Sequence, residues 1–134
     1  MSRRLSLLVV GVAAASLLAC SSSSKSGTAP TIRDFTLAPT ALTVGTTPDL
    51  NGGLTIEDVD GDIAGASGEV LFPDGKVVPI QDVNLQAGSA TSTPVSYKIP
   101  SFPAAQAGEY TVSVQARDRE GNQSLKASVK LTAK

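Results

Sequence analysis

Two stretches near the C-terminus alternate between apolar and polar side chains. In residues 110–117 and 125–132 the apolar members are Tyr110, Val112, Val114, Ala116, Leu125, Ala127, Val129 and Leu131. Successive side chains of a β-strand point to opposite faces, so a period of two places one set in a core and the other in water. The polar segment 118–122 between them ends in Gly-Asn, which accepts the positive φ of tight connections. The sequence therefore predicts an antiparallel hairpin.

Most of the chain upstream reads as short strands separated by turns. The further predicted strands are residues 31–37, 42–44, 50–58, 68–72, 77–80, 81–85 and 94–99. Phe-Pro-Asp-Gly-Lys at residues 72–76 predicts a turn, because proline presets φ and glycine accepts the left-handed conformation. No segment here keeps a helical period. This pattern predicts an all-β fold: a single immunoglobulin-like antiparallel β-sandwich of about seven strands over residues 31–134.

The eight prolines indicate which strands lie at the edges of the sheets. Proline cannot donate to a β-ladder, so proline-free segments are the best candidates for interior strands. Residues 54–58, 110–117 and 125–132 are free of proline. Asn-Gly-Gly at residues 51–53 has two interpretations, a bulge within a strand or a hairpin turn that splits it.

Two motifs in this region resemble known bacterial modules. Ala-Gly-Glu-Tyr-Thr-Val-Ser-Val at residues 107–114, followed by Asp118 and Gly-Asn, is similar to the last two strands of immunoglobulin-like, PKD-like and cadherin-like modules. Ile-Glu-Asp-Val-Asp-Gly-Asp-Ile at residues 56–63 resembles their D-x-D-G-D turn after the second strand. The resemblance implies the sandwich fold, with Tyr110 as a corner tyrosine whose hydroxyl bonds nearby backbone. The alternative is a plain core aromatic.

The N-terminus carries the pattern of a processed leader. Met-Ser-Arg-Arg precedes an apolar run over residues 5–19, which is too short to span a bilayer comfortably and predicts a cleaved, helical signal peptide over residues 1–19. The run ends in Leu-Leu-Ala-Cys, which resembles the bacterial lipobox. That resemblance implies attachment of a diacylglyceryl group to the Cys20 thiol, cleavage before Cys20 and acylation of the new amino group, with palmitate among the chains. The alternative is an ordinary secretory signal that leaves Cys20 as a free thiol.

A short tether would join this anchor to the domain. Residues 20–30 hold the predicted lipidated Cys20 and a Ser-rich linker, which spans roughly 17 Å as a flexible coil. Lipidation predicts that the bilayer is a partner and that the protein belongs to the cell envelope. Ser21 stands where the resemblance would put an inner-membrane retention aspartate, which favours the outer membrane in a diderm bacterium.

Four carboxylates gather in the segment 57–62. Glu57, Asp58, Asp60 and Asp62 lie around Gly61, whose flexibility permits a sharp turn. In a sandwich of this topology the loop holding Asp118 lies at the same end. Ca²⁺ takes six to eight oxygen ligands, so we predict a Ca²⁺ site from Asp58, Asp60, Asp62 and Asp118, with chain entry at the same end. The alternative is a solvated acidic turn without a required cofactor.

Composition excludes several functional classes. Removal of Arg3 and Arg4 with the leader leaves nine basic against twelve acidic side chains, a net charge of −3, which argues against nucleic acid as a partner. The chain has no histidine and one cysteine, which argues against common general-base chemistry and against a disulfide scaffold.

These observations predict a non-catalytic structural or protein-interaction module with an envelope protein as partner. The alternative is a Ca²⁺- or glycan-binding module using the turn from Glu57 to Asp62. Arg117, Lys126 and Lys130 share the outward parity of the last two strands, which is compatible with a small basic stripe or with protection against edge-to-edge aggregation.

Overall fold

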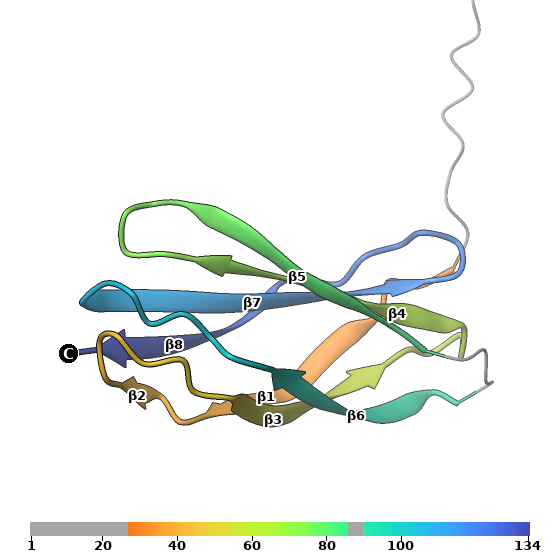
Figure 1. Cartoon of the computed structure of the whole chain (residues 1–134). Coiled ribbons are helices and arrows are strands. Elements are labelled where there is room, and N and C mark those ends of the chain that lie inside the picture. Colours follow the sequence, from red (N-terminus) through yellow and green to blue (C-terminus); the bar gives the residue numbers. More distant parts are fainter. Residues whose placement is uncertain (1–26, 86–89) are drawn as a thin grey trace, which may run out of the picture.

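The computed structural model describes residues 27–85 and 90–134, and within these ranges the chain consists of β-strands and loops (Figure 1). The strands are β1 (Thr31–Ala38), β2 (Ala41–Leu42), β3 (Leu50–Glu57), β4 (Ile63–Leu71), β5 (Val77–Asn84), β6 (Ser92–Ile99), β7 (Gly108–Asp118) and β8 (Ala127–Ala133). The all-β prediction is confirmed, with eight strands because the two-residue β2 is counted. The predicted signal peptide, Cys20 and most of the linker lie outside the described residues. No helix long and apolar enough to cross a membrane occurs within those ranges.

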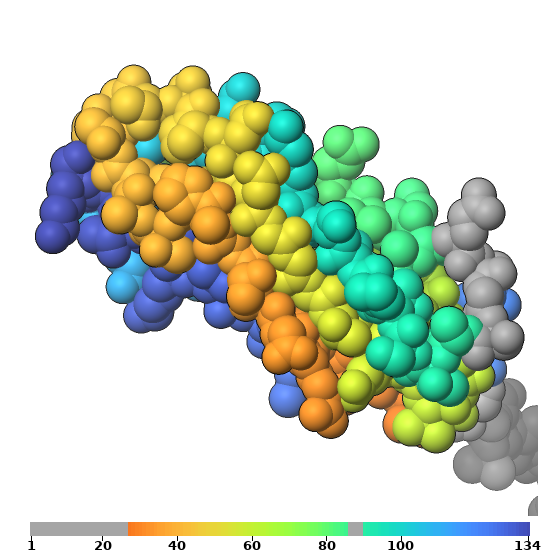
Figure 2. Space-filling view, turned by 90° about the horizontal axis from the view of Figure 1, so that it is seen from below, coloured from red at the N-terminus to blue at the C-terminus, as the bar shows by residue number. Residues whose placement is uncertain are grey.

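The strands form the two layers of an immunoglobulin-like sandwich. One sheet has the order β1-β3-β6 and the other the order β2-β8-β7-β4-β5. Figure 2 looks onto the smaller sheet, where orange β1, yellow β3 and teal β6 run side by side. Every adjacent pair is antiparallel except β2 and β8, which are parallel. The predicted antiparallel sandwich is confirmed apart from this two-residue pairing, which is parallel because the chain changes sheets between β1 and β2 without reversing direction.

Proline placement follows the predicted rule. Pro79 lies on β5 and Pro94 on β6, and each of these strands is at an edge of its sheet. The proline-free strands β3, β7 and β8 each have a neighbour on both sides. Both prolines, which have no amide proton to donate, therefore lie on strands that pair with a neighbour on one side only.

The core follows the alternation of β7 and closes around Tyr110. Tyr110, Val112, Val114 and Ala116 are fully buried. The Tyr110 hydroxyl donates to the Gln106 carbonyl at 2.9 Å and accepts from the Gln106 amide at 3.0 Å. This confirms the corner tyrosine, which ties the start of β7 to the chain four residues upstream.

The predicted alternation of the last strand is wrong at its first member. Leu125 was expected on the buried face, yet it is 91% exposed, and β8 begins only at Ala127. Ser124 is buried instead, where its hydroxyl accepts from the Ala116 amide at 2.9 Å and its own amide donates to the Ala116 carbonyl at 3.0 Å. These bonds place Ser124 instead of Leu125 against β7, so Leu125 points to solvent.

Asn51, Gly52 and Gly53 lie inside a continuous β3, so neither a turn nor a bulge in that strand is present. The irregularity is on the neighbouring strand, where the register of β1 shifts between Arg33 and Thr36. A Cβ at Gly52 would lie 1.8 Å from the Thr36 carbonyl oxygen, so glycine is required by this close approach. The largest other differences from the predicted strands are that residues 77–80 and 81–85 merge into β5 and that β4 begins five residues before position 68.

Candidate metal centre

Three aspartates from two loops converge at the end of the sandwich where the described chain begins. Asp58 directly follows β3, Asp62 directly precedes β4, and Asp118 ends β7. One carboxylate oxygen from each lies within 4.8 Å of the other two. The predicted approach of the loop after β3 to the loop after β7 is therefore observed for these three residues.

The turn between β3 and β4 is held by its own backbone. The Gly61 amide donates to the Asp58 carbonyl at 3.2 Å, and Gly61 has a φ of 70° that favours glycine. The Asp58 amide donates to the Thr91 carbonyl at 2.8 Å, and the Arg119 amide donates to the Asp62 carbonyl at 3.0 Å. No sequence motif marks Thr91, whose anchoring bond crosses from the segment before β6. Main-chain bonds thus fix both carboxylate-bearing positions.

Two carboxylate oxygens of this cluster are buried without a hydrogen-bond partner among the described residues. They are Asp58 Oδ2 and Asp62 Oδ1. The other Asp58 oxygen accepts from the Asp60 amide at 3.0 Å, while the Asp58 residue as a whole is only 2% exposed. A buried carboxylate oxygen with no donor is unfavourable unless a proton or cation reaches it.

Asp118 completes the cluster from the β7–β8 turn. It is 3% exposed, and its oxygens accept from the backbone amide and side-chain amide of Asn122 at 2.7 and 2.6 Å. Each ionised carboxylate offers about four lone-pair sites, so these bonds leave capacity for a cation. The side-chain amide of Asn122 acts as a donor to Asp118.

The crowding of negative charge perturbs the protonation of Asp62. Burial, the hydrogen-bonding proximity of Asp58 and the negative charges of Asp118 and Asp58 all raise the pKa of Asp62 above its usual value. Like charges confined together disfavour simultaneous ionisation. A divalent cation placed among these oxygens would reverse that effect.

The other predicted acidic residues face elsewhere. Asp60 is not among the converging carboxylates, because its Oδ2 accepts from the Thr28 amide. A Cβ at Gly27 would lie 2.9 Å from Glu120 and 3.0 Å from Asp60, so both carboxylates flank the incoming chain. Glu57 instead pairs with Arg33 at 2.6 Å. The carboxylates of this turn therefore lie in three places: Asp58 and Asp62 in the cluster, Asp60 beside the incoming chain, and Glu57 beside β1.

The outward basic residues of the last two strands are paired with acidic groups. Arg117 lies 3.4 Å from Asp82, and Lys130 lies 2.9 Å from Glu109. Lys126 pairs with Glu69. These pairs neutralise the predicted basic stripe, and being surface pairs they contribute little stability.

No family model matches the chain, and no curated protein matches it. Similar solved structures include the Pseudomonas fluorescens alkylpurine DNA glycosylase AlkC bound to DNA containing an abasic site analog, at 15% identity and a TM-score of 0.52. That similarity covers 78% of this chain but only 30% of AlkC.

A Niemann-Pick type C2 protein from the Japanese carpenter ant is similar over 81% of this chain and 96% of its own, at 9% identity and a TM-score of 0.51. The CARDB domain of a Pyrococcus furiosus protein, in complex with di-metal ions, gives 12% identity and a TM-score of 0.47, with coverage of 78% and 91%. At these identities the similarities concern the fold alone.

Proposed function

We propose that this chain is a lipid-anchored envelope lipoprotein whose immunoglobulin-like domain is a non-catalytic structural or protein-interaction module that binds Ca²⁺ at its tether-proximal end. The calcium part rests on two buried oxygens of Asp58 and Asp62, beside Asp118, that have no hydrogen-bond partner in residues 27–85 and 90–134. The lipobox-like sequence before Cys20 supports the anchor.

Ca²⁺ fits the donor set better than softer metals do. The three converging side chains are all carboxylates, and hard oxygen ligands are typical of Ca²⁺ and Mg²⁺. Ca²⁺ accepts irregular coordination with carboxylate, carbonyl and water oxygens, whereas Mg²⁺ demands near-ideal octahedral geometry. Asp58, Asp62 and Asp118 would hold the ion, and water would complete its coordination. Affinities of extracellular Ca²⁺ modules lie around 10⁻⁴ to 10⁻³ M, which sets the concentration range for testing.

A bound ion would stabilise the junction between the tether and the sandwich. The Asp58 and Asp62 loop also holds Asp60, which accepts from the Thr28 amide of the incoming chain. Neutralising the cluster would favour the folded arrangement of this loop, and with it the position of the tether. We infer a structural role for the ion, since the chain has no histidine to serve as general base beside it.

The anchor itself is tested by processing. Two or three acyl chains hold a protein on a membrane where one does not, so acylated Cys20 would place the domain close to the bilayer. Globomycin, which blocks the lipoprotein signal peptidase, should cause an unprocessed precursor to accumulate. A mature chain of normal size under that drug would contradict the lipoprotein assignment. Fractionation would then test the proposed outer-membrane location.

The calcium site is tested by calorimetric titration of the mature chain. We expect saturable Ca²⁺ binding with about one ion per chain and a higher Tm in Ca²⁺ than in EDTA, because a ligand that binds only the folded state stabilises it. Asp62→Asn should abolish the response. The matched control is Asp74→Asn, the same change of charge in the β4–β5 turn at the opposite end of the sandwich (Figure 1).

The choice between an interaction module and a ligand-binding module is tested by pull-down from detergent-solubilised membranes. A stoichiometric envelope protein would support the interaction role. Absence of such a protein, together with Ca²⁺-dependent stability, would favour the ligand-binding role, and glycan binding stays a prediction of the acidic turn alone.

A further inference from the structure

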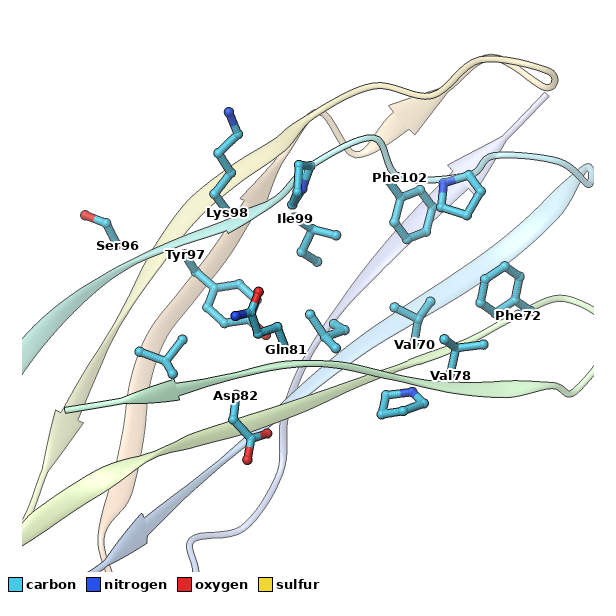
Figure 3. A pocket seen from close by; sticks show the side chains of 15 residues that line it. Val70, Phe72, Val78, Gln81, Asp82, Ser96, Tyr97, Lys98, Ile99 and Phe102 are labelled. Carbon is cyan, nitrogen blue, oxygen red and sulfur yellow. The ribbon is translucent and has the colours of Figure 1, made fainter.

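The two sheets leave an apolar cleft where their edge strands face each other. The cleft has a volume of about 610 Å³ and lies between β5 of one sheet and β6 of the other (Figure 3). β5 and β6 do not pair, so no ladder closes this side of the sandwich. Its apolar walls include Val70, Val78, Ile80, Tyr97, Ile99 and Phe102. Sites for small molecules are typically clefts of about 300 to 1,000 Å³ with walls of this kind.

One buried polar group in this cleft has no partner among the described residues. Tyr97 is 4% exposed, lines the cleft from β6, and its hydroxyl makes no hydrogen bond there. Figure 3 shows its ring directed away from the β6 ribbon into the space between the sheets. Buried tyrosine hydroxyls usually find a partner, as that of Tyr110 does.

The backbone opposite makes room for this hydroxyl. A Cβ at Gly68 of β4 would lie 2.5 Å from the Tyr97 oxygen, so a larger residue there would displace it. The edge of the Tyr97 ring also packs against Phe35, with ring centroids 6.2 Å apart and planes at 86°. The ring therefore holds the hydroxyl in place, and the hydroxyl makes no hydrogen bond to the part of the chain that the structure describes.

The surroundings indicate which kind of group would satisfy it. Burial, and secondarily the negative charge of Asp82, raise the pKa of Tyr97, so the hydroxyl keeps its proton and can act as a donor. The charged residues lining the cleft are already paired: Asp82 with Arg117 and Lys98 with Asp49. An additional anion would gain no free cation from Lys98 and would meet Asp82. A neutral ligand is favoured.

We propose that the cleft between β5 and β6 binds a small, neutral, apolar molecule and that the Tyr97 hydroxyl donates a hydrogen bond to its carbonyl, ester or ether oxygen. The apolar walls would provide affinity by removing hydrocarbon from water, and the single donor would orient the molecule. None of the three metal-centre aspartates lines this cleft, so the two sites are separable.

The test uses prodan, an apolar fluorescent ketone whose emission moves to shorter wavelength in apolar surroundings. With the mature protein we expect saturable binding of one prodan per chain and a blue shift. Tyr97→Phe keeps the ring but removes the donor, and should weaken binding about 3- to 10-fold, the value of one hydrogen bond. Unchanged affinity in this variant would overturn the assigned role of the hydroxyl.

Val78→Trp should fill the cleft and abolish binding, whereas Val77→Trp on the same strand, at a residue that does not line the cleft, should leave binding intact. Equal binding by both tryptophan variants, or no saturable binding by the wild type, would overturn the site. If Val78→Trp fails to fold, the prodan affinity of Tyr97→Phe tests the site instead. Asp62→Asn should bind prodan normally, so failure of the calcium proposal is distinguishable from failure of this one.

A second copy of the chain closing the same side would appear as a concentration-dependent dimer in sedimentation velocity. A dimer abolished by Val78→Trp, without prodan binding to the monomer, would overturn the small-molecule proposal.

Discussion

Replacing Tyr110 with phenylalanine removes one oxygen atom and two hydrogen bonds from the core. The hydroxyl donates to the Gln106 carbonyl at 2.9 Å and accepts from its amide at 3.0 Å, and Tyr110 is fully buried. A hydrogen bond contributes about 0.5 to 1.5 kcal/mol net, so losing both should lower the free energy of unfolding by about 1 to 3 kcal/mol. For a domain of this size, each kcal/mol corresponds to a fall in Tm of roughly 4 to 8 °C.

Tyr97→Phe is the matched control for this change. It removes the same atom from a residue that is 4% exposed, but whose hydroxyl has no partner among the described residues. Removing a buried, unsatisfied hydroxyl should leave stability unchanged or raise it. Urea denaturation of both variants, with equal m-values, gives the change in the free energy of unfolding of each variant relative to the wild type. A loss of stability in Tyr97→Phe as large as that in Tyr110→Phe would show that the two hydrogen bonds of Tyr110 do not account for its contribution.

Three further predictions test other parts of the structure. Gly52→Ala should destabilise the domain by about 1 to 3 kcal/mol or more, because its methyl would lie 1.8 Å from the Thr36 oxygen. Gly53→Ala, with its nearest contact at 3.1 Å, should cost less in the same urea assay. In EDTA, stability should fall as pH rises from the usual Asp pKa of 3.8 through the raised folded-state pKa of Asp62, and Asp62→Asn should remove this fall in a Tm-against-pH series. Cys20→Ser should move the protein from the membrane to the soluble fraction, and unchanged membrane association in carbonate-washed membranes would contradict acylation.

The strands with a clean alternation were predictable, since burial of one face fixes the phase of every residue. β7 follows its pattern from Tyr110 to Ala116, but the second alternating stretch begins at Leu125 in the sequence and only at Ala127 in the fold. The hydrogen bonds of Ser124 to Ala116 decide the phase there, and a local contact of this kind has no periodic signature.

The acidic centre was predictable in outline only. Sandwich topology brings Asp58, Asp62 and Asp118 to one end, as expected from the order of the loops. The direction of the Asp60 side chain depends on the turn backbone and on its hydrogen bond to Thr28. Neither can be predicted from the spacing of the carboxylates in the sequence. The cleft at Tyr97 depends on β5 and β6 remaining unpaired, which is a property of sheet order and not of either strand's sequence.

The most direct test of the calcium site is a crystal structure of the mature domain grown with millimolar Ca²⁺. We expect a density peak within Ca²⁺–oxygen bonding distance, about 2.3 to 2.6 Å, of oxygens from Asp58, Asp62 and Asp118. A peak coordinated by other residues, or water-level density among these three carboxylates at saturating Ca²⁺, would contradict it.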